Sequence, residues 1–234
     1  MIGIVAALPL EARCLLGRKV KPGERISLDD AGWMQVSGIG REKARSAAYS
    51  LLDAGATALL SWGVSGGLDP QLLPGTLVLP RQIHAADRNL FPVDEAWRRR
   101  IHACVFRHVR VSDGALIEAL AVIASPAQKR SLAQASGAVA VDMESAAVGQ
   151  AAKQAGVPFV AVRAVVDTAD STLPRSVLRA NDEYGRLRIA KLLFSLISHP
   201  ADLGALIGLS KNFRAAQATL QITARLAGPK LCLQ

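Results

Sequence analysis

The segment VPFVAVRAVVDTAD, residues 157–170, is the strongest indication of the fold class. Its apolar run Pro158–Val166 has the length and composition of a fully buried strand. Immediately before it, Glu144–Gly156 repeats small apolar residues at helical spacing, and Gly156 stops that helix. The short apolar run Val139–Val141 precedes the helix and completes a strand–helix–strand unit. Such a unit is typical of an α/β protein, in which helices cover a central sheet.

The same alternation continues toward the N-terminus. Further buried strands are predicted at Ile2–Leu8, Ala56–Leu60 and Thr76–Leu79, each bounded by Gly, Pro or polar turn residues. Arg41–Ala54 places alanines and leucines on one face and is predicted to be a helix. We therefore expect a layered α/β fold with a largely parallel or mixed central sheet. Charged residues are expected to cluster where strands end and helices begin.

Composition limits the class of protein. The chain has 234 residues, 50% of them hydrophobic and 20% charged, which suits one large globular domain or two small ones. Three cysteines, an odd number without framework spacing, argue against a disulfide-stapled secreted fold and a zinc site. The opening MIGIVAALPL, residues 1–10, lacks the basic start of a signal peptide and is predicted to be a first buried strand. No apolar run reaches the roughly 18 residues of a membrane span, so we expect a cytoplasmic protein.

The net charge of +9 is unevenly spread, because residues 171–234 hold nine Lys or Arg against three acids. The aromatic content of 4% and the lack of an RNA-binding segment or a helix-turn-helix signature argue against nucleic acid as the partner. We expect residues 1–199 to form the main domain and residues 200–234 a basic helical extension. Two interpretations of this extension stay open. In the first it forms a pair of helices packed on the core. In the second it forms a surface that binds an anionic membrane or a lipidic substrate.

Acids follow three of the predicted strands. Glu11 follows the first strand, Asp142 and Glu144 follow the middle one, and Asp167 ends the last. Asp142 can simply cap a helix, whereas capping accounts less well for Glu144. Converging carboxylates with different surroundings can divide the work of a proton donor and an ionised group, and Arg163 can join them. That division suits cleavage of a glycosidic bond, whose transition state resembles an oxocarbenium cation.

Other motifs carry less weight. SGIGREKA, residues 37–44, has Lys43 where the third glycine of a dinucleotide-binding fingerprint belongs. WGVSGGL, residues 62–68, is predicted to be a strand-to-turn loop whose backbone amides can approach a ligand closely. The four histidines show no zinc spacing. The basic stretch Trp97–Arg110 is predicted to be a solvated helix or connection, with a phosphate or lipid-head contact as the alternative.

Five strings together resemble the nucleoside phosphorylase and methylthioadenosine/S-adenosylhomocysteine nucleosidase family. They are IGIVAALPLEA, SGIGREKA, SWGVSGGLDPQLLPGTLVLP, AVDMESAAV and VPFVAVRAVVDTAD, which occur in the family's order between residues 2 and 170. The C-terminal extension is further similar to the hopanoid-associated branch, which is proposed to remove adenine from adenosylhopane. The resemblance implies a three-layer α/β/α sandwich around a mixed, twisted sheet, with residues 1–199 as the catalytic domain.

The resemblance also implies a role for each candidate site residue. Asp167 would be the general acid that hydrogen-bonds purine N7 and lets adenine leave neutral. Glu144, with Met143 beside it, would hold the ribose hydroxyls and the developing charge of the sugar. Glu11 would activate a water, and Arg163 would lie near that nucleophile. The backbone of one glycine-rich loop would line the ribose and base pocket through Gly63, Val64, Ser65 and Gly66.

Two departures from the family pattern bear on the nucleophile. Phosphorylases of this family usually place a phosphate-binding arginine where this chain has Ser61, and Val64 replaces the serine or threonine that often follows Gly63. Nucleosidases also lack that arginine, and Glu11 would repel a phosphate dianion, so hydrolysis is the easier chemistry. The hopanoid branch is nevertheless commonly called a phosphorylase, so water and phosphate both stay open from the sequence.

The expected enzyme cleaves the N-glycosidic bond of an adenine nucleoside with a modified 5′ group, and the apolar, basic C-terminus favours adenosylhopane. The rival interpretations are a phosphorylase giving a ribose 1-phosphate, a hydrolase of methylthioadenosine or S-adenosylhomocysteine, and a catalytically silent nucleoside-binding or membrane-associated protein. No metal or organic cofactor is implied. The resemblance implies a homodimer and places Leu116 or Ile117 near the stacked purine. Peripheral contact with the inner membrane face is an option for the C-terminus.

Overall fold

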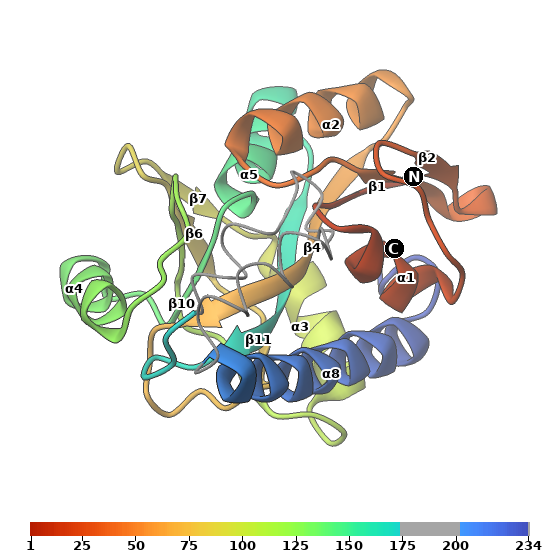
Figure 1. Cartoon of the computed structure of the whole chain (residues 1–234). Helices are drawn as coiled ribbons and strands as arrows, with labels where there is room; N and C mark the ends of the chain where they lie inside the picture. The colour runs from red at the N-terminus through yellow and green to blue at the C-terminus, as the bar shows by residue number, and fades with distance from the viewer. Residues whose placement is uncertain (174–201, 234) are drawn as a thin grey trace.

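The computed structural model describes residues 1–173 and 202–233, which fold around a mixed sheet (Figure 1). The eleven strands in these ranges are β1 (Ile2–Ala6), β2 (Arg25–Ser27), β3 (Gly32–Val36), β4 (Ala58–Gly67), β5 (Leu77–Val78), β6 (Gln82–His84), β7 (Leu90–Pro92), β8 (Val111–Ser112), β9 (Leu116–Glu118), β10 (Ala140–Asp142) and β11 (Phe159–Asp167). Their main order is β2-β3-β1-β4-β10-β9-β6-β7, and β11 pairs with both β4 and β5. Every strand predicted from the sequence has a counterpart in this sheet.

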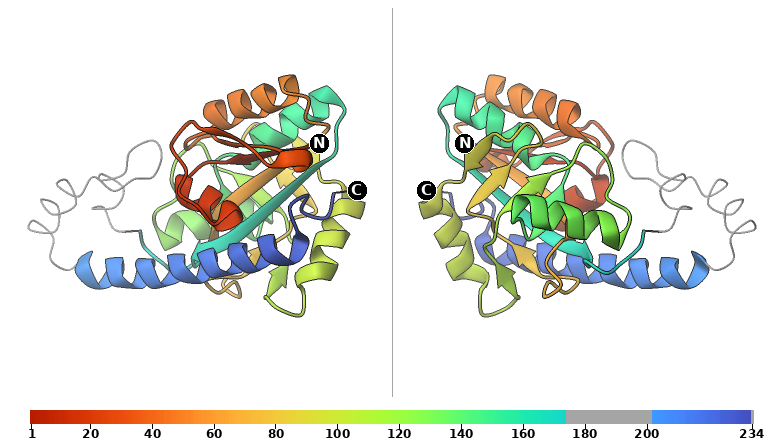
Figure 2. Two further views of the ribbon diagram at one scale, coloured as in Figure 1. Left: turned by 90° about the vertical axis from the view of Figure 1, so that its right-hand side faces the viewer. Right: turned by 90° about the vertical axis from the view of Figure 1, so that its left-hand side faces the viewer.

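Helices cover both faces of the sheet, as the three-layer prediction requires (Figures 1 and 2). The helices of the described ranges are α1 (Pro9–Leu16), α2 (Arg41–Asp53), α3 (Glu95–Val105), α4 (Pro126–Ser136), α5 (Ser145–Ala155) and α8 (Asp202–Ala227), with a 3₁₀ turn at Asp29–Ala31. The helices α2 and α5 pack on one face, and α1, α3 and α8 pack on the other. The α/β/α sandwich is therefore confirmed.

Strand β4 is the centre of the sheet and differs from its prediction. The sequence predicts a turn loop over residues 62–68, yet β4 continues as regular strand to Gly67. Its first half pairs in parallel with β1, its second half pairs antiparallel with β10, and β11 runs parallel along most of its length. Backbone hydrogen bonds from both sides hold the glycines in extended form, so the loop prediction is wrong. Glycine at these positions instead leaves room for neighbouring side chains.

Two hydrophobic cores fix the sheet between its helix layers. One core lies under α1, α3 and α8 and contains the fully buried Trp62, Trp97 and Leu220. The other lies under α2 and α5 and is built largely from alanine, valine and leucine, including Ala147 and Val165. A smaller cluster packs α4 against β9 and β10 and against Leu68, which directly follows β4. The alanine-rich faces of α2 and α5 let these helices approach the sheet closely.

The basic stretch around residue 100 is a helix, but it is not simply solvated. Helix α3 buries Trp97, Arg98, Ile101 and Val105. The Trp97 indole Nε1 donates to the Leu231 carbonyl at 2.6 Å, which ties the C-terminal turn to α3. The prediction of a solvated element holds only for the outer face of α3, which carries the exposed Arg99.

The C-terminal segment forms one helix in its described part, where the sequence allowed a pair. Helix α8 runs unbroken from Asp202 to Ala227 and lies along α1, α3 and β11 (Figure 2). It ends at Gly228, which has a positive φ of 72° and precedes Pro229. The predicted boundary between residues 199 and 200 lies outside the described residues, so the two-part division stays a prediction.

Candidate active site

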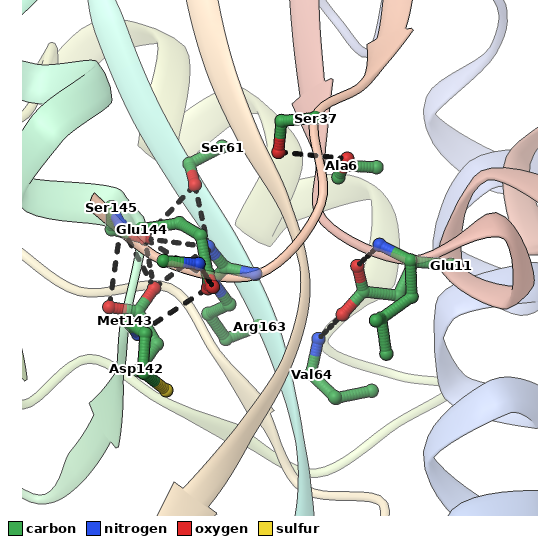
Figure 3. A network of polar contacts seen from close by, with 12 residues as sticks. Ala6, Glu11, Ser37, Ser61, Val64, Asp142, Met143, Glu144, Ser145 and Arg163 are labelled. Atoms are coloured by element: carbon green, nitrogen blue, oxygen red, sulfur yellow. Dashed lines mark hydrogen bonds and ion pairs between the residues drawn. The ribbon is translucent and has the colours of Figure 1, made fainter. Parts of the chain in front are cut away.

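Arg163 is the centre of a buried polar network (Figure 3). It lies in the middle of β11, opposite Gly63 of β4, and its side chain is 1% exposed. Its Nη2 lies 2.7 Å from Asp142 Oδ2 and 3.8 Å from Glu144 Oε2. A buried guanidinium requires paired charge, and these two acids supply it. The structure thus brings Glu144, from the connection between β10 and α5, together with Arg163 of β11.

Two buried serines also accept hydrogen bonds from Arg163. Its Nη2 donates to Ser61 Oγ at 2.7 Å, and its Nε donates to Ser145 Oγ at 3.2 Å. Ser145 Oγ donates in turn to Asp142 and lies 3.1 Å from Ser61 Oγ. The Nη1 group is buried and has no hydrogen-bond partner among the described residues. The Nη1 edge of the guanidinium can therefore donate a hydrogen bond to a ligand or a water.

Glu11 reaches the same region from the opposite side of β4. Helix α1 begins after Leu8 with Pro9 in its first position, which sets Glu11 at the third. Glu11 Oε2 accepts from the Leu8 backbone N–H at 2.8 Å, and Oε1 accepts from the Val64 N–H at 2.9 Å. The Trp62 indole donates to the Glu11 carbonyl at 3.0 Å and fixes this end of α1.

Gly63 is the point where Glu11 and Arg163 meet. A Cβ atom built on Gly63 would lie 2.3 Å from Glu11 Oε1 and 2.4 Å from Arg163 Nη1. Both charged groups therefore occupy the space that a side chain would fill. The open Nη1 of Arg163 and a carboxylate oxygen of Glu11 face one small region beside the β4 backbone. This juxtaposition suits the binding and activation of a small polar molecule such as water.

Glu144 is held between the backbone and the arginine. It precedes α5, and its Oε1 accepts from the Gly40 backbone N–H at 2.9 Å. Burial is the main cause that raises the pKa of Glu144 to about 7, with Asp142 and Glu11 adding to the rise and Arg163 opposing it. Burial likewise raises the pKa of Glu11 above its ordinary value, again against Arg163. Two carboxyls with different partners and raised pKa values are typical of catalytic sites.

Asp167 is the last residue of β11. It pairs with Gly66 of β4, whereas Arg163 pairs with Gly63. A β-bulge between Val165 and Asp167 shifts the register and re-aims the end of β11. The Asp167 carboxyl sits over Gly66, where a built Cβ would lie 3.3 Å from Oδ2 and 3.4 Å from Oδ1. Burial raises the pKa of Asp167, and the buried Lys129 ammonium, which is bonded to Oδ2, opposes that rise.

The other predicted site residues lie next to these groups. Met143 is half-buried between Asp142 and Glu144, and Val64 and Ser65 belong to β4. The Ser65 hydroxyl is buried and without a hydrogen-bond partner in the described part of the chain. Leu116 and Ile117 are both buried on β9 in different clusters, so the position of the purine ring stays a prediction.

Three site residues went unnoticed or were underrated in the sequence. Lys129 was missed, although Leu132 and Ala133, three and four residues on, share the packed face of α4 with it. Ser145 was not singled out, and Asp142 was treated as a cap. Asp142 does accept from the Ser145 backbone N–H, at 3.2 Å, but it is also the nearest carboxylate to Arg163.

Solved structures with the same fold include several nucleosidases. The methylthioadenosine/S-adenosylhomocysteine nucleosidase of Neisseria meningitidis, in complex with methylthio-immucillin-A, has a TM-score of 0.72 at 20% identity over 99% of each chain. The futalosine hydrolase of Helicobacter pylori has a TM-score of 0.70 at 18% identity, over 99% of this chain and 97% of that one. The S-adenosylhomocysteine nucleosidase of Streptococcus pyogenes has a TM-score of 0.65 at 19% identity, over 96% of both chains. These likenesses establish the fold.

The family assignment rests on the sequence match. Residues 32–198 match the family described as the phosphorylase superfamily. The match spans well over half of the chain and contains Asp142, Glu144, Arg163 and Asp167. The chain is therefore an enzyme that belongs to the phosphorylase superfamily.

Proposed function

We propose that this enzyme hydrolyses the N-glycosidic bond of an adenine nucleoside with a modified 5′ group and releases adenine. The observation that carries the proposal is the meeting of Glu11 and Arg163 at Gly63, with Glu144 bonded into the same network. A carboxylate with a raised pKa can accept a proton from water, and the adjacent guanidinium can orient that water. Glu144 is the third charged group available to a bound sugar.

In this proposal each acid acts at a different bond. Asp167 gives its proton to purine N7 while the electron pair of the C1′–N9 bond leaves with the base. Glu144 accepts hydrogen bonds from the ribose hydroxyls and stabilises the cationic sugar. Glu11 takes a proton from the water that attacks C1′. Met143 and the β4 backbone at Gly63, Val64, Ser65 and Gly66 line the ribose and base.

The surroundings of Ser61 support water over phosphate as the nucleophile. Ser61 is fully buried and its hydroxyl accepts from Arg163 Nη2, so this position supplies no cation for a phosphate dianion. The charge of Arg163 is already balanced by Asp142 and Glu144 at its Nη2, although its Nη1 has no hydrogen-bond partner among the described residues. The nearby Glu11 carboxylate would also repel an anion. Phosphorolysis, with a ribose 1-phosphate product, is the second candidate.

Adenosylhopane is the 5′-modified substrate that we propose. Support comes from the basic, leucine-rich C-terminus. In the described helix α8 of this segment, the apolar Ile207 is 65% exposed. Part of this apolar content serves the fold, because Ala216 and Leu220 are fully buried against the core. The names of the similar structures suggest the competing substrates methylthioadenosine, S-adenosylhomocysteine and futalosine.

The assembly and location of the enzyme also belong to this proposal. We propose a cytoplasmic homodimer whose C-terminus contacts the inner membrane face at its surface. In the residues that the structure describes, helices are too short or too polar to cross a membrane. Neither a metal ion nor an organic cofactor has a step in the proposed reaction.

The test incubates the purified enzyme with adenosylhopane and, separately, with methylthioadenosine, each with and without inorganic phosphate. Free adenine and a free ribosyl product without phosphate are the expected result, with adenosylhopane turned over faster. Release that requires phosphate and gives a sugar 1-phosphate would replace hydrolysis by phosphorolysis. Equal turnover of methylthioadenosine would remove the lipid group from the proposal, and no release from either substrate would overturn it.

A further inference from the structure

Lys129 is a buried cation that the proposed chemistry has not used. It lies in the first turns of α4, where Ser125 caps the helix and accepts from the Gln128 N–H at 3.3 Å. Pro126 occupies the first helical position, so the helix begins at a fixed point and carries Lys129 inward. The Lys129 side chain is 0% exposed, although α4 lies at the edge of the molecule (Figure 1).

The Lys129 ammonium is fully engaged at the end of β11. It donates to Asp167 Oδ2, to the Thr168 carbonyl at 2.6 Å and to the Ser171 carbonyl at 3.3 Å. Three N–H donors thus meet three acceptors, which is the full capacity of a protonated lysine. Burying an ammonium is costly, and a purely apolar side chain could pack α4 without that cost.

Among residues 1–173 and 202–233, Lys129 is the charged group that faces the Asp167 carboxyl. From β4 the carboxyl meets Gly66, and beside it β10 presents the apolar Val141. Asp170, in the turn after β11, is exposed to solvent. The Lys129 ammonium lowers the pKa of Asp167 against the effect of burial. It also occupies Oδ2, so that Oδ1 is the oxygen left for a ligand.

We infer that Lys129 is a positioning residue for Asp167, which anchors one carboxyl oxygen and sets the acidity of the proton donor. This inference rests on the proposed function of Asp167. As Asp167 gives its proton to purine N7, a carboxylate forms at the ammonium, and Lys129 keeps all three of its own protons. The attraction between the two charges grows during proton transfer, so it favours the transition state over the ground state.

The test compares the pH dependence of kcat for the wild type, Lys129→Met, Lys129→Arg and Asp167→Asn on adenosylhopane, or on methylthioadenosine where the wild type prefers it. Lys129→Met removes the charge, so Asp167 stays protonated to higher pH. We expect the alkaline limb of the profile to move up by about one to three pH units and kcat at the plateau to fall about tenfold or more. Lys129→Arg keeps the charge and is expected to keep the limb near that of the wild type.

A matched control and a second variant keep the outcomes separate. Arg130→Met removes an exposed cation from the next position of α4 and should leave the profile unchanged. Where Lys129→Met fails to fold, the pH profiles of Lys129→Gln and Lys129→Arg are compared instead. These two variants have long polar side chains and differ in charge. An unmoved limb in the neutral variants, with lower stability alone, would make Lys129 merely structural and overturn the inference.

The same data separate this inference from the proposed function. If the wild type releases no adenine, the proposed function fails. If Asp167→Asn keeps the wild-type alkaline limb, Asp167 is not the acid and its assignment fails. If Asp167→Asn abolishes the limb while the neutral Lys129 variants leave it in place, only the inference about Lys129 fails.

Discussion

A single missing side chain at Gly63 creates the space in which the candidate nucleophile site is built. Glu11 comes from α1 and Arg163 from β11, and both reach the volume where a Cβ atom would lie. The Glu11 carboxylate is held by the Val64 N–H, so it has little freedom to retreat. The site therefore needs glycine at this position, because any side chain would overlap both charged groups.

Gly63→Ala is the direct test of this reasoning. The added methyl group would force Glu11 and Arg163 apart, because it would lie within 2.4 Å of both. Misplacement of reacting groups by about 1 Å costs on the order of a hundredfold in rate, so we expect kcat to fall by at least that factor. Steady-state rates of adenine release measure the loss, and circular dichroism checks that the fold is kept.

The control for Gly63→Ala is Gly208→Ala on α8. A Cβ atom there meets open space, so its rate should equal that of the wild type. Wild-type activity in Gly63→Ala would show that Glu11 and Arg163 are not the groups that handle the nucleophile.

Protonation of Glu144 is expected to contribute to the decline of kcat/KM at low pH, the acid limb of the pH profile. Its pKa of about 7 means that it loses the ionised form, which accepts hydrogen bonds from the ribose, as the pH falls through neutrality. We expect kcat/KM to decline below about pH 7. Glu144→Gln should remove the contribution of Glu144 to this limb, leaving that of Glu11, and lower kcat/KM about tenfold to hundredfold, the value of hydrogen bonds to a charged group.

The matched control for Glu144→Gln is Glu42→Gln. Glu42 is 70% exposed at its side chain and, within the described residues, forms an ion pair with Arg45 of the same helix α2. Its variant should keep the acid limb of the wild type. An acid limb that is unchanged in Glu144→Gln would assign that titration to another group.

At the scale of elements, the long regular segments are the ones that the sequence predicts well. Strands β1 and β11 and helices α2 and α5 carry an uninterrupted local pattern, and each lies within about three residues of its prediction. Short strands such as β5 and β8 have two residues each and exist only because distant partners pair with them. Pairing also overrode the turn signal of the glycines in β4.

The same distinction explains which parts of the site were found. Glu11, Glu144 and Asp167 follow apolar strands, so a local rule places them at the edge of the sheet. Lys129 and Asp167 are 38 residues apart, and Ser61 and Arg163 are 102 apart. No local pattern encodes contacts at such separations, because they depend on how the layers pack.

Helix α8 contributes to the stability of the whole sandwich. Its Leu220 is fully buried beside β11, and the Thr219 hydroxyl donates to the Gly75 carbonyl at 2.7 Å. Leu220→Ala would leave a cavity, and we expect the free energy of unfolding to fall by about 2–5 kcal/mol. Denaturant unfolding measures this loss.

Ile207→Ala is the matched control on the same helix. Ile207 is 65% exposed, so its truncation should change the free energy of unfolding by less than about 0.5 kcal/mol. Equal effects of the two variants would show that α8 does not pack on the core in solution.

At the scale of the whole molecule, the site imposes a cost on the fold. Burial raises the pKa of Glu11, Glu144 and Asp167 together, so the folded chain holds protons that the unfolded chain releases. These acids occupy positions where the protein opposes their ionised form. Such sites trade stability for reactivity, and the balance depends on pH.

The sign of this dependence follows from Glu144. An unfolded glutamate loses its proton near pH 4.5, whereas Glu144 in the folded chain holds it to about 7. Between these values the folded state binds more protons, so the free energy of unfolding decreases as the pH rises. Glu95, whose pKa is lowered to about 2 by Arg98, acts below that window. We therefore expect the Tm to fall as the pH is raised from about 5 to about 7.

Glu144→Gln removes one of the responsible groups, so its Tm should fall less steeply across that window, while Glu42→Gln should run parallel to the wild type. Differential scanning calorimetry at closely spaced pH values gives both slopes. A wild-type Tm that rises with pH across the window would mean that the carboxyls are stabilised as anions in the fold. Arg163 would then outweigh burial, and Glu11 and Glu144 would be ionised from the outset of the reaction.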